Sequence, residues 1–381
     1  MNETASTDEA ATPDTLFGVR VMELNFGPQH PSTHGVLRLK LKIDGERILD
    51  CYPIIGYLHR GTEKLFELHP YFQNVPHTDR MDYVAAATNN LAYVGAVEKL
   101  VGLVPPPRAR YIRTLLAELQ RIASHLLWLA THAIDIGAMT PFFYCFRERE
   151  QVLDLFEEYC GARLTLNCMR PGGQPFDLPV GWVESCRAFC EDFPSKVDEY
   201  EGLLTNNRIW KQRTVGVGVL DPDRALDWGI SGPMLRGSGV NWDLRKARPY
   251  EAYAEVDFDV PLGSNGDTYD RYLVRVAEMR QSARIILQCL DQIPDGPIMA
   301  KKPRVLKAPK DSEVYHSIEG PKGEIGFYIV GDGTPNPYRC HVRAPSFINL
   351  QALPELCKGH LLADLVALIG TTDIVLGEVD R

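Results

Sequence analysis

The chain has 381 residues, 45% of them hydrophobic and 24% charged, and its formal net charge is −9. These values are typical of a folded protein, exclude a disordered chain and leave room for more than one lobe. An acidic balance without a long basic run argues against nucleic acid as a partner. The most apolar stretches, 126–139 and 360–370, are short and interrupted by acidic residues, so we expect no membrane span.

Residues 1–19 are acidic and polar, and we expect them to form a mobile tail rather than a signal peptide. Alternation of apolar and polar residues then predicts antiparallel strands in a β-rich domain over 20–75. A hairpin turn is expected at 43–47, around Gly45. The expected strands cover 20–26, 35–43 and 47–52.

The loop at 27–35, GPQHPSTHG, carries two histidines four residues apart. Its proline and its final glycine indicate a rigid backbone. As zinc ligands, His30 and His34 would need further partners, and the proline between them argues against a helix that would align them. The alternative is a hydrogen-bonded loop in which a serine or threonine hydroxyl caps a turn, and the residues alone favour it.

Helical periodicity begins near Tyr83 and predicts a helix-bundle domain over 76–310. In the clearest helix, 109–139, apolar residues recur every three or four positions. An irregular, glycine-rich insertion is expected at about 205–265. Three further long helices are expected at 141–161, 183–204 and 269–293.

The last segment, 311–381, returns to strand patterns before it ends in helix. Strands are expected at 324–330 and 338–344, followed by a helix at 353–369. We therefore predict an α+β fold with an N-terminal antiparallel sheet, a central helix bundle and a mixed C-terminal segment that rejoins the start.

Polar residues at two places indicate a site. Arg80, Asp82 and Tyr83 stand just before a helix, where an acidic group can also simply favour the helix dipole. Asp135 follows a long apolar stripe, and a buried carboxylate there needs a partner. That partner is either the nearby His132 or a histidine distant in sequence.

Nine cysteines include no CxxC pair, so we expect buried thiols. Cys186 and Cys190 lie one helical turn apart and could share a metal, but no second pair accompanies them and packing is the favoured interpretation. The GxG fragments at 216–218 and 331–333 lack the third glycine of a dinucleotide fingerprint, so no NAD site is expected on this chain.

Several segments resemble one family, in one order: NFGPQHPSTHGVLRL, GYLHRGTEK, RMDYVAAATNNLAY, HAIDIGAMTPFFYCFRERE, and APSFINLQALP with DIVLGEVDR. They are similar to the D subunit of the proton-pumping NADH-quinone oxidoreductases, respiratory complex I, and the resemblance covers 20–381. That family is similar in fold to the large subunit of nickel–iron hydrogenases. The hydrogenase patterns R-x-C-G-x-C and D-P-C-x-x-C-x-x-H read RMDYVA at 80–85 and DIVLGEVDR at 373–381 here. Because all four thiolates are missing, we expect no nickel and no metal on this chain.

The resemblance implies a quinone in the emptied cavity, with His34 and Tyr83 as catalytic residues that hold its two carbonyl groups. Asp82 is implied to bind the quinone as well. Asp135 is implied as a third catalytic residue that pairs with His34 and favours its imidazolium form. These residue types suit a two-electron, two-proton reduction, because a donor at each end of the ring stabilises the growing negative charge.

The resemblance also implies that the electrons come from an iron–sulfur cluster in the adjacent B subunit. Arg60 and Arg80 match the arginines that face this cluster, where positive charge raises its potential. The structural alternative is an ion pair between such an arginine and Glu63. Thr165 stands where many members carry a histidine, and it cannot titrate.

The implied function is that of the quinone-reducing subunit of a proton-translocating NADH-quinone oxidoreductase, active only within the complex. The implied partners are the cluster-bearing B subunit directly, the C, I and H subunits, and the inner membrane, reached through the complex on its cytoplasmic side. One alternative is the same subunit in a complex that takes electrons from ferredoxin or a deazaflavin and reduces another quinone-like acceptor. Two others are a scaffold without a ligand and a zinc hydrolase built on His30 and His34.

Overall fold

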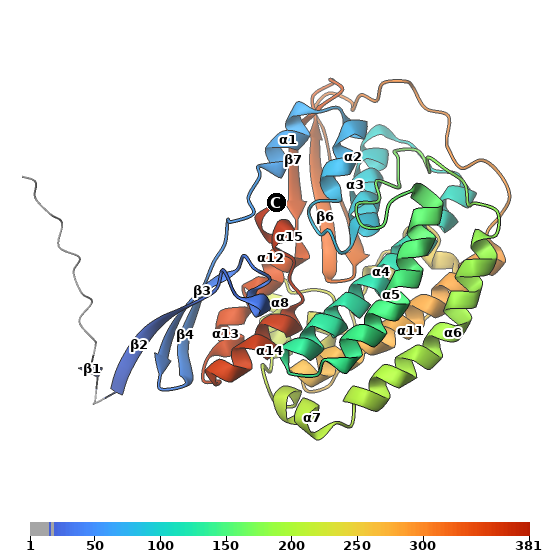
Figure 1. Cartoon of the computed structure of the whole chain (residues 1–381). Helices are drawn as coiled ribbons and strands as arrows, with labels where there is room; N and C mark the ends of the chain where they lie inside the picture. The colour runs from blue at the N-terminus through green and yellow to red at the C-terminus, as the bar shows by residue number, and fades with distance from the viewer. Residues whose placement is uncertain (1–14, 17–18) are drawn as a thin grey trace, which may run out of the picture.

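The computed structural model describes residues 15–16 and 19–381, so most of the tail expected at 1–19 lies outside the described residues. The described chain has an α+β fold, as predicted, in which two antiparallel sheets are separated in sequence by a series of helices. In Figure 1 the first sheet extends at the lower left beside helices from the end of the chain, and the second lies at the top of the view.

The N-terminal sheet forms because apolar residues alternate along its strands. In β3 (Arg38–Asp44), Leu39, Leu41 and Ile43 are buried and the lysines between them are exposed. Gly45 makes the predicted hairpin turn with a φ of 58°. The buried face packs against helices near the end of the chain, and together they form one hydrophobic core. The neighbouring antiparallel strands are β1 (Thr15–Leu16), β2 (Val19–Phe26) and β4 (Arg47–Ile54).

Four long helices form the body of the protein, as the apolar periodicity predicts. They are α4 (Pro107–Asp135), α5 (Thr140–Cys160), α6 (Trp182–Leu204) and α11 (Thr268–Gln292). Helix α4 packs against α5 and α11, and α6 packs against the same two helices, so the four close into a bundle (Figure 1). Helix α4 ends four residues before the predicted 139, because Gly137 takes a φ of 97° and Pro141 begins the next helix.

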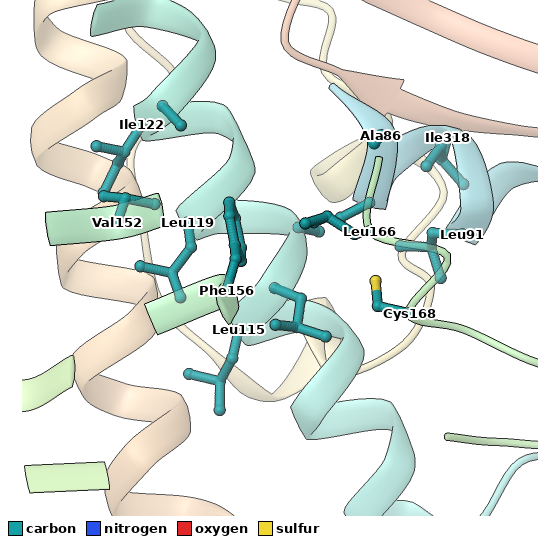
Figure 2. Packing of buried hydrophobic residues seen from close by; sticks show 14 of the residues in the cluster. Ala86, Leu91, Leu115, Leu119, Ile122, Val152, Phe156, Leu166, Cys168 and Ile318 are labelled. Atoms are coloured by element: carbon teal, nitrogen blue, oxygen red, sulfur yellow. The ribbon is translucent and has the colours of Figure 1, made fainter. Parts of the chain in front are cut away.

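The larger hydrophobic core lies inside this bundle. Figure 2 shows Leu115, Leu119 and Ile122 of α4 beside Val152 and Phe156 of α5. Each of these side chains is almost fully buried. The regular spacing on both helices therefore produces interlocking apolar faces.

The second sheet consists of β5 (Ser312–Gly320), β6 (Gly323–Gly331) and β7 (Pro337–Arg343). The predicted strands in this region correspond to β6 and β7, whereas β5 was not predicted. Helix α3 (Ala86–Val101) packs against β5 and β6, and α1 (Thr62–Leu68) packs against β7. The tight turn between β5 and β6 contains Pro321 and Lys322, and Lys322 reaches Ser124 of α4.

The helix predicted at 353–369 is wrong as a single element. It is divided into α13 (Leu353–Cys357) and α14 (Leu362–Thr372), because Gly359 takes a φ of 85° and Leu361 forms a bridge with Arg47 of β4. The bridge ties the C-terminal segment to the N-terminal sheet. Two short helices flank this pair, α12 (Pro345–Leu350) and α15 (Leu376–Asp380).

The region expected to be irregular, about 205–265, contains only short helices. They are α7 (Arg208–Thr214), α8 (Pro222–Asp227), α9 (Pro233–Gly237), α10 (Leu244–Ala247) and the 3₁₀ turn η3 (Tyr253–Glu255). The 3₁₀ turn η1 (Pro31–Thr33) follows β2. The 3₁₀ turn η2 (Tyr71–Asn74) and α2 (Val75–Thr78) lie beside α1 and α3. Within the part of the chain that the structure describes, no helix combines the length and apolarity needed to cross a membrane. The domain boundaries at 75 and 310 stay predictions.

Candidate functional site

The histidine loop is a capped 3₁₀ turn. The Nδ1 atom of His30 accepts a hydrogen bond from the backbone amide of Ser32 at 3.2 Å, and the hydroxyl of Thr33 donates to the backbone carbonyl of His30 at 2.8 Å. His34 ends the turn with a φ of 53°, in the left-handed region that non-glycine residues rarely adopt. The turn therefore holds His34 in a defined and strained position.

His34 lines a cavity of about 340 Å³ together with Tyr83 and Asp135. The three come from separate parts of the chain: the 3₁₀ turn, the segment before α3, and the last residue of α4. Trp128, Lys322 and Asp373 also line this cavity, and most of the remaining wall is apolar. The fold thus brings the three residues implied as catalytic into one hollow.

The protonation of His34 differs from the sequence-based expectation. Although solvent reaches the residue, protein atoms surround the ring, and this burial lowers the pKa of His34. The ammonium of Lys322 lowers it further, and the backbone of Ile374 acts in the opposite direction. The expected imidazolium is therefore disfavoured, and a neutral imidazole is favoured.

Among the described residues Asp135 contacts Ser32, and its pairing with His34 stays a prediction. Its carboxylate accepts a hydrogen bond from the hydroxyl of Ser32 at 2.9 Å, and within the described residues no ion pair joins it to either His34 or His132. Burial raises the pKa of Asp135, and the Ser32 hydrogen bond and His30 oppose that rise. Asp135 therefore anchors the histidine loop to the end of α4.

His132, the nearer alternative partner for Asp135, belongs to the core. Its ring stacks on Trp128 with centroids 5.1 Å apart, and neither ring nitrogen has a hydrogen-bond partner among the described residues. Burial lowers the pKa of His132 to about 3. The ring is therefore a neutral packing group at neutral pH.

Lys322 is the site residue that sequence reasoning missed. It is buried, and its Nζ atom lies 3.1 Å from the carboxylate of Asp82 and donates to the hydroxyl of Ser124 at 3.0 Å. Burial alone would lower its pKa, but the carboxylates of Asp373 and Asp82 outweigh this effect and the pKa of Lys322 is raised. In sequence, a lysine between a proline and a glycine reads as an exposed hairpin turn, so no local signal indicates a buried cation.

Asp82 was expected to contact the quinone, and the structure gives that expectation no geometric support. The residue does not border the cavity, and its carboxylate reaches the wall only through Lys322. Behind the same wall, burial and the charge of Asp82 raise the pKa of Glu378 to about 7. Buried carboxyl groups therefore surround the single ammonium of Lys322.

The two arginines expected to face a cluster lie side by side on the surface. The guanidinium of Arg60 donates to the backbone carbonyl of Arg80 at 2.8 Å, and the guanidinium of Arg80 lies 3.5 Å from Asp79. The alternative ion pair with Glu63 is not formed, because Glu63 pairs with Arg339 at 2.7 Å and His341 at 3.0 Å. Both arginines are exposed, as a role toward a neighbouring subunit requires.

Neither alternative metal site, the one at His30 and His34 or the one at Cys186 and Cys190, has a full set of ligands among the described residues. Residues 15–16 and 19–381 contain no group of three histidine, cysteine or acidic side chains placed to hold a metal ion. The thiols of Cys186 and Cys190 are both buried, and the neighbouring thiol of Cys186 raises the pKa of Cys190. His30 uses one ring nitrogen to cap its turn.

The α+β fold, with a helix bundle between two sheets and a cavity without thiolates, places the chain in the class of proteins that resemble the large subunit of nickel–iron hydrogenases. A family model described as the 49 kDa subunit of the respiratory-chain NADH dehydrogenase matches residues 135–312 and 306–381. The chain belongs to this family.

Curated relatives match along nearly the whole chain. An NADH-quinone oxidoreductase D subunit of Solibacter usitatus, numbered 2, is 58% identical over 370 residues, which cover 97% of this chain and 100% of the relative. The NADH-quinone oxidoreductase D subunit of Geotalea uraniireducens is 52% identical, with 96% and 100% covered. A D subunit of Thermodesulfovibrio yellowstonii, also numbered 2, is 53% identical, with 94% and 96% covered.

Proposed function

We propose that this chain binds a quinone in the 340 Å³ cavity and provides the site of its reduction within an NADH-quinone oxidoreductase. The observation that carries the proposal is that His34 and Tyr83, from separate segments of the chain, line the same hollow. The proteins that share more than half of its residues are named for NADH and quinone, which favours NADH over ferredoxin or a deazaflavin as the donor of the whole complex.

The chemistry of the wall suits a ring that accepts electrons at two oxygens. Burial and the charge of Asp82 raise the pKa of Tyr83, so its hydroxyl stays protonated and can donate a hydrogen bond to one carbonyl. A neutral His34 has a single N–H, and in the tautomer that directs it into the cavity this N–H can donate to the other carbonyl. As electrons arrive, negative charge on the ring opposes the effect of Lys322 and favours protonation of His34.

Protons for the quinol can come from the same wall. Asp135 and Asp373 both line the cavity, and burial raises the pKa of each carboxyl group. A carboxyl group with a raised pKa holds its proton closer to neutral pH and can release it when a stronger base forms nearby. In this proposal His34 and Tyr83 contact the ring, and the two aspartates resupply the proton.

We propose that the exposed arginines, Arg60 and Arg80, face an iron–sulfur cluster of the adjacent B subunit, which delivers the electrons. Positive charge close to a cluster stabilises its reduced form. The remaining proposed partners are the C, I and H subunits. The chain would then reach the cytoplasmic side of the inner membrane as a peripheral subunit, and the change in charge around His34 and Asp135 would be the event that couples quinone reduction to proton translocation.

A photoreactive quinone analogue tests the proposal directly. Illumination of the assembled complex should attach the probe to peptides containing 27–35, 80–84 or 124–135, and excess unmodified quinone should prevent it. The labelled peptides are identified by mass spectrometry. Labelling that unmodified quinone prevents, but that falls only outside these three segments, would refute the proposal.

The hydrogen bond between Ser32 and Asp135 should position His34 for catalysis. Removing it in Ser32→Ala or in Asp135→Ala should lower kcat/KM for quinone by about 10-fold, because a small displacement of a reacting group is costly. The double variant should be no worse than either single one. The measurement is steady-state quinone reduction by the purified complex.

Asp135→Asn is the matched control, because its amide oxygen can still accept the Ser32 hydrogen bond. It keeps the anchor but has no carboxyl proton to supply, so it should lose part of the activity but less than Asp135→Ala does. If Asp135→Asn is as impaired as Asp135→Ala, the negative charge or the proton of Asp135 matters more than the anchor.

A further inference from the structure

One side of the proposed quinone cavity is a stripe of α4. Ser124, Trp128, Thr131 and Asp135 recur every three or four residues along this helix, and all of them line the cavity. Trp128 has the largest side chain of the four and is only 4% exposed. It is therefore the largest side chain on this side of the wall, and it borders the hollow with the small part of its surface that other side chains leave uncovered.

Contacts from three helices fix the indole ring of Trp128. Its Nε1–H donates to the backbone carbonyl of Gly370 in α14 at 2.7 Å, and the guanidinium carbon of Arg275 in α11 lies 4.2 Å from the ring centroid. His132, one turn further along α4, stacks on it with an interplanar angle of 22°. With hydrogen-bond, cation–π and stacking contacts all satisfied, the ring has little freedom to move.

The support behind the ring is itself closely packed. A side chain at Gly370 would place a Cβ atom 2.2 Å from the Nδ1 atom of His132, so only glycine allows α14 to approach α4 this closely. Arg275 is fully buried, donates to the backbone carbonyl of Thr371 at 2.9 Å and lies 3.7 Å from Asp373, another residue of the cavity wall. The position of Trp128 is thus set by the same helices that complete the cavity.

We infer that Trp128 packs against the quinone ring and determines how large a head-group the cavity accepts. This inference rests on the proposed function. A quinone has polar groups at the ends of its ring and apolar faces between them. His34 and Tyr83 serve the ends, whereas the faces need an apolar wall. Because Trp128 cannot swing aside, it sets a fixed limit on the width of the ring, and a rigid wall discriminates by size where a mobile one adapts.

The test compares two acceptors in the assembled complex, a water-soluble benzoquinone with one ring and a water-soluble naphthoquinone with two. In Trp128→Ala, KM for the benzoquinone should rise by about 3- to 10-fold, the loss expected when one aromatic contact is removed. The naphthoquinone should lose less or gain, because its second ring can occupy the vacated space. The ratio of kcat/KM for naphthoquinone to that for benzoquinone should therefore rise several-fold. Trp128→Phe should shift the ratio in the same direction by a smaller factor.

Trp182 offers a matched control. It is also buried and its Nε1–H also donates to a backbone carbonyl, that of Leu155 at 2.9 Å, but it does not line the cavity. Trp182→Phe should leave the ratio unchanged. The rate with an artificial electron acceptor that does not use the cavity reports on assembly of the complex. If Trp128→Ala fails to assemble, the ratio measured for Trp128→Phe decides whether Trp128 determines head-group size.

An unchanged ratio in an assembled Trp128 variant overturns the inference, because it means that the indole only supports the fold. The variant Tyr83→Phe in the same assay separates this failure from that of the proposed function. Suppose that Tyr83→Phe loses quinone reduction while the Trp128 variants keep the parent's ratio of kcat/KM for the two acceptors. The cavity is then the quinone site, but Trp128 does not determine the size of the head-group. If Tyr83→Phe still reduces quinone at the parent's rate, both the proposed function and the role of Trp128 are refuted.

Discussion

Replacing Tyr83 by phenylalanine should lower the turnover number for quinone reduction by about 100-fold, the usual cost of removing one donor to a developing oxyanion. Phenylalanine keeps the ring, which lies close to the backbone of Gly377, and removes only the hydroxyl. Because the pKa of Tyr83 is raised chiefly by burial, the wild-type hydroxyl is a protonated donor throughout the neutral range. The measurement is the quinone reductase rate of the purified complex, divided by its rate with an acceptor that does not use the cavity.

Tyr111→Phe is the control for this experiment. Burial also raises the pKa of Tyr111, to about 12, but its hydroxyl donates to Glu255 at 2.6 Å, away from the cavity. This variant should keep the turnover number of the parent. Equal rates in Tyr83→Phe and the parent would mean that no quinone oxygen lies at the Tyr83 hydroxyl.

Removing Arg236 should destabilise the fold by about 3–5 kcal/mol, because buried carboxylates lose their counter-charge. Arg236 is fully buried, and its guanidinium lies 2.7 Å from Glu319, 2.8 Å from Glu278 and 3.7 Å from Asp243. In Arg236→Met the three acids remain in a low-dielectric interior with less compensation. Urea-induced unfolding followed by tryptophan fluorescence measures the change.

The chain contains a matched surface arginine. Arg163 also contacts three carboxylates, those of Glu150, Asp154 and Glu157, but its side chain is 39% exposed and the three acids are more than half exposed. Arg163→Met should therefore cost far less than Arg236→Met. Adding Glu278→Gln and Glu319→Gln to Arg236→Met should recover part of the loss, since fewer uncompensated charges remain. Similar losses in the two arginine variants would show that burial does not control the effect.

Local periodicity explains which parts of the fold the sequence predicts. The alternation in β3 and the apolar stripe of α4 are imposed by a single buried face, so they can be read without knowing the partner. Strand β5 was missed because polar residues, His316 and Glu319, occupy buried positions in it, so that apolar residues do not alternate clearly. The break at Gly359 was missed because a bridge to Arg47, distant in sequence, helps to fix it.

In the candidate site, too, local sequence indicates some features, whereas others depend on contacts between distant segments. The resemblance of the HPSTHG and RMDY segments indicates His34 and Tyr83, and the structure places both in one cavity. The partner of Asp135 could not be predicted from local spacing, because Ser32 lies 103 residues earlier in the chain. The lowered pKa of His34 depends on burial and on Lys322, and both arise only when the second sheet meets α4.

The position of Lys322 has a consequence for the speed of electron acceptance. Its ammonium sits on a tight turn between two paired strands and is held from two sides by Asp82 and Ser124. A dipole or charge that is already oriented does not have to rearrange when an electron reaches the cavity. For the proposed quinone reduction, we therefore expect this β-hairpin to keep the reorganisation energy low.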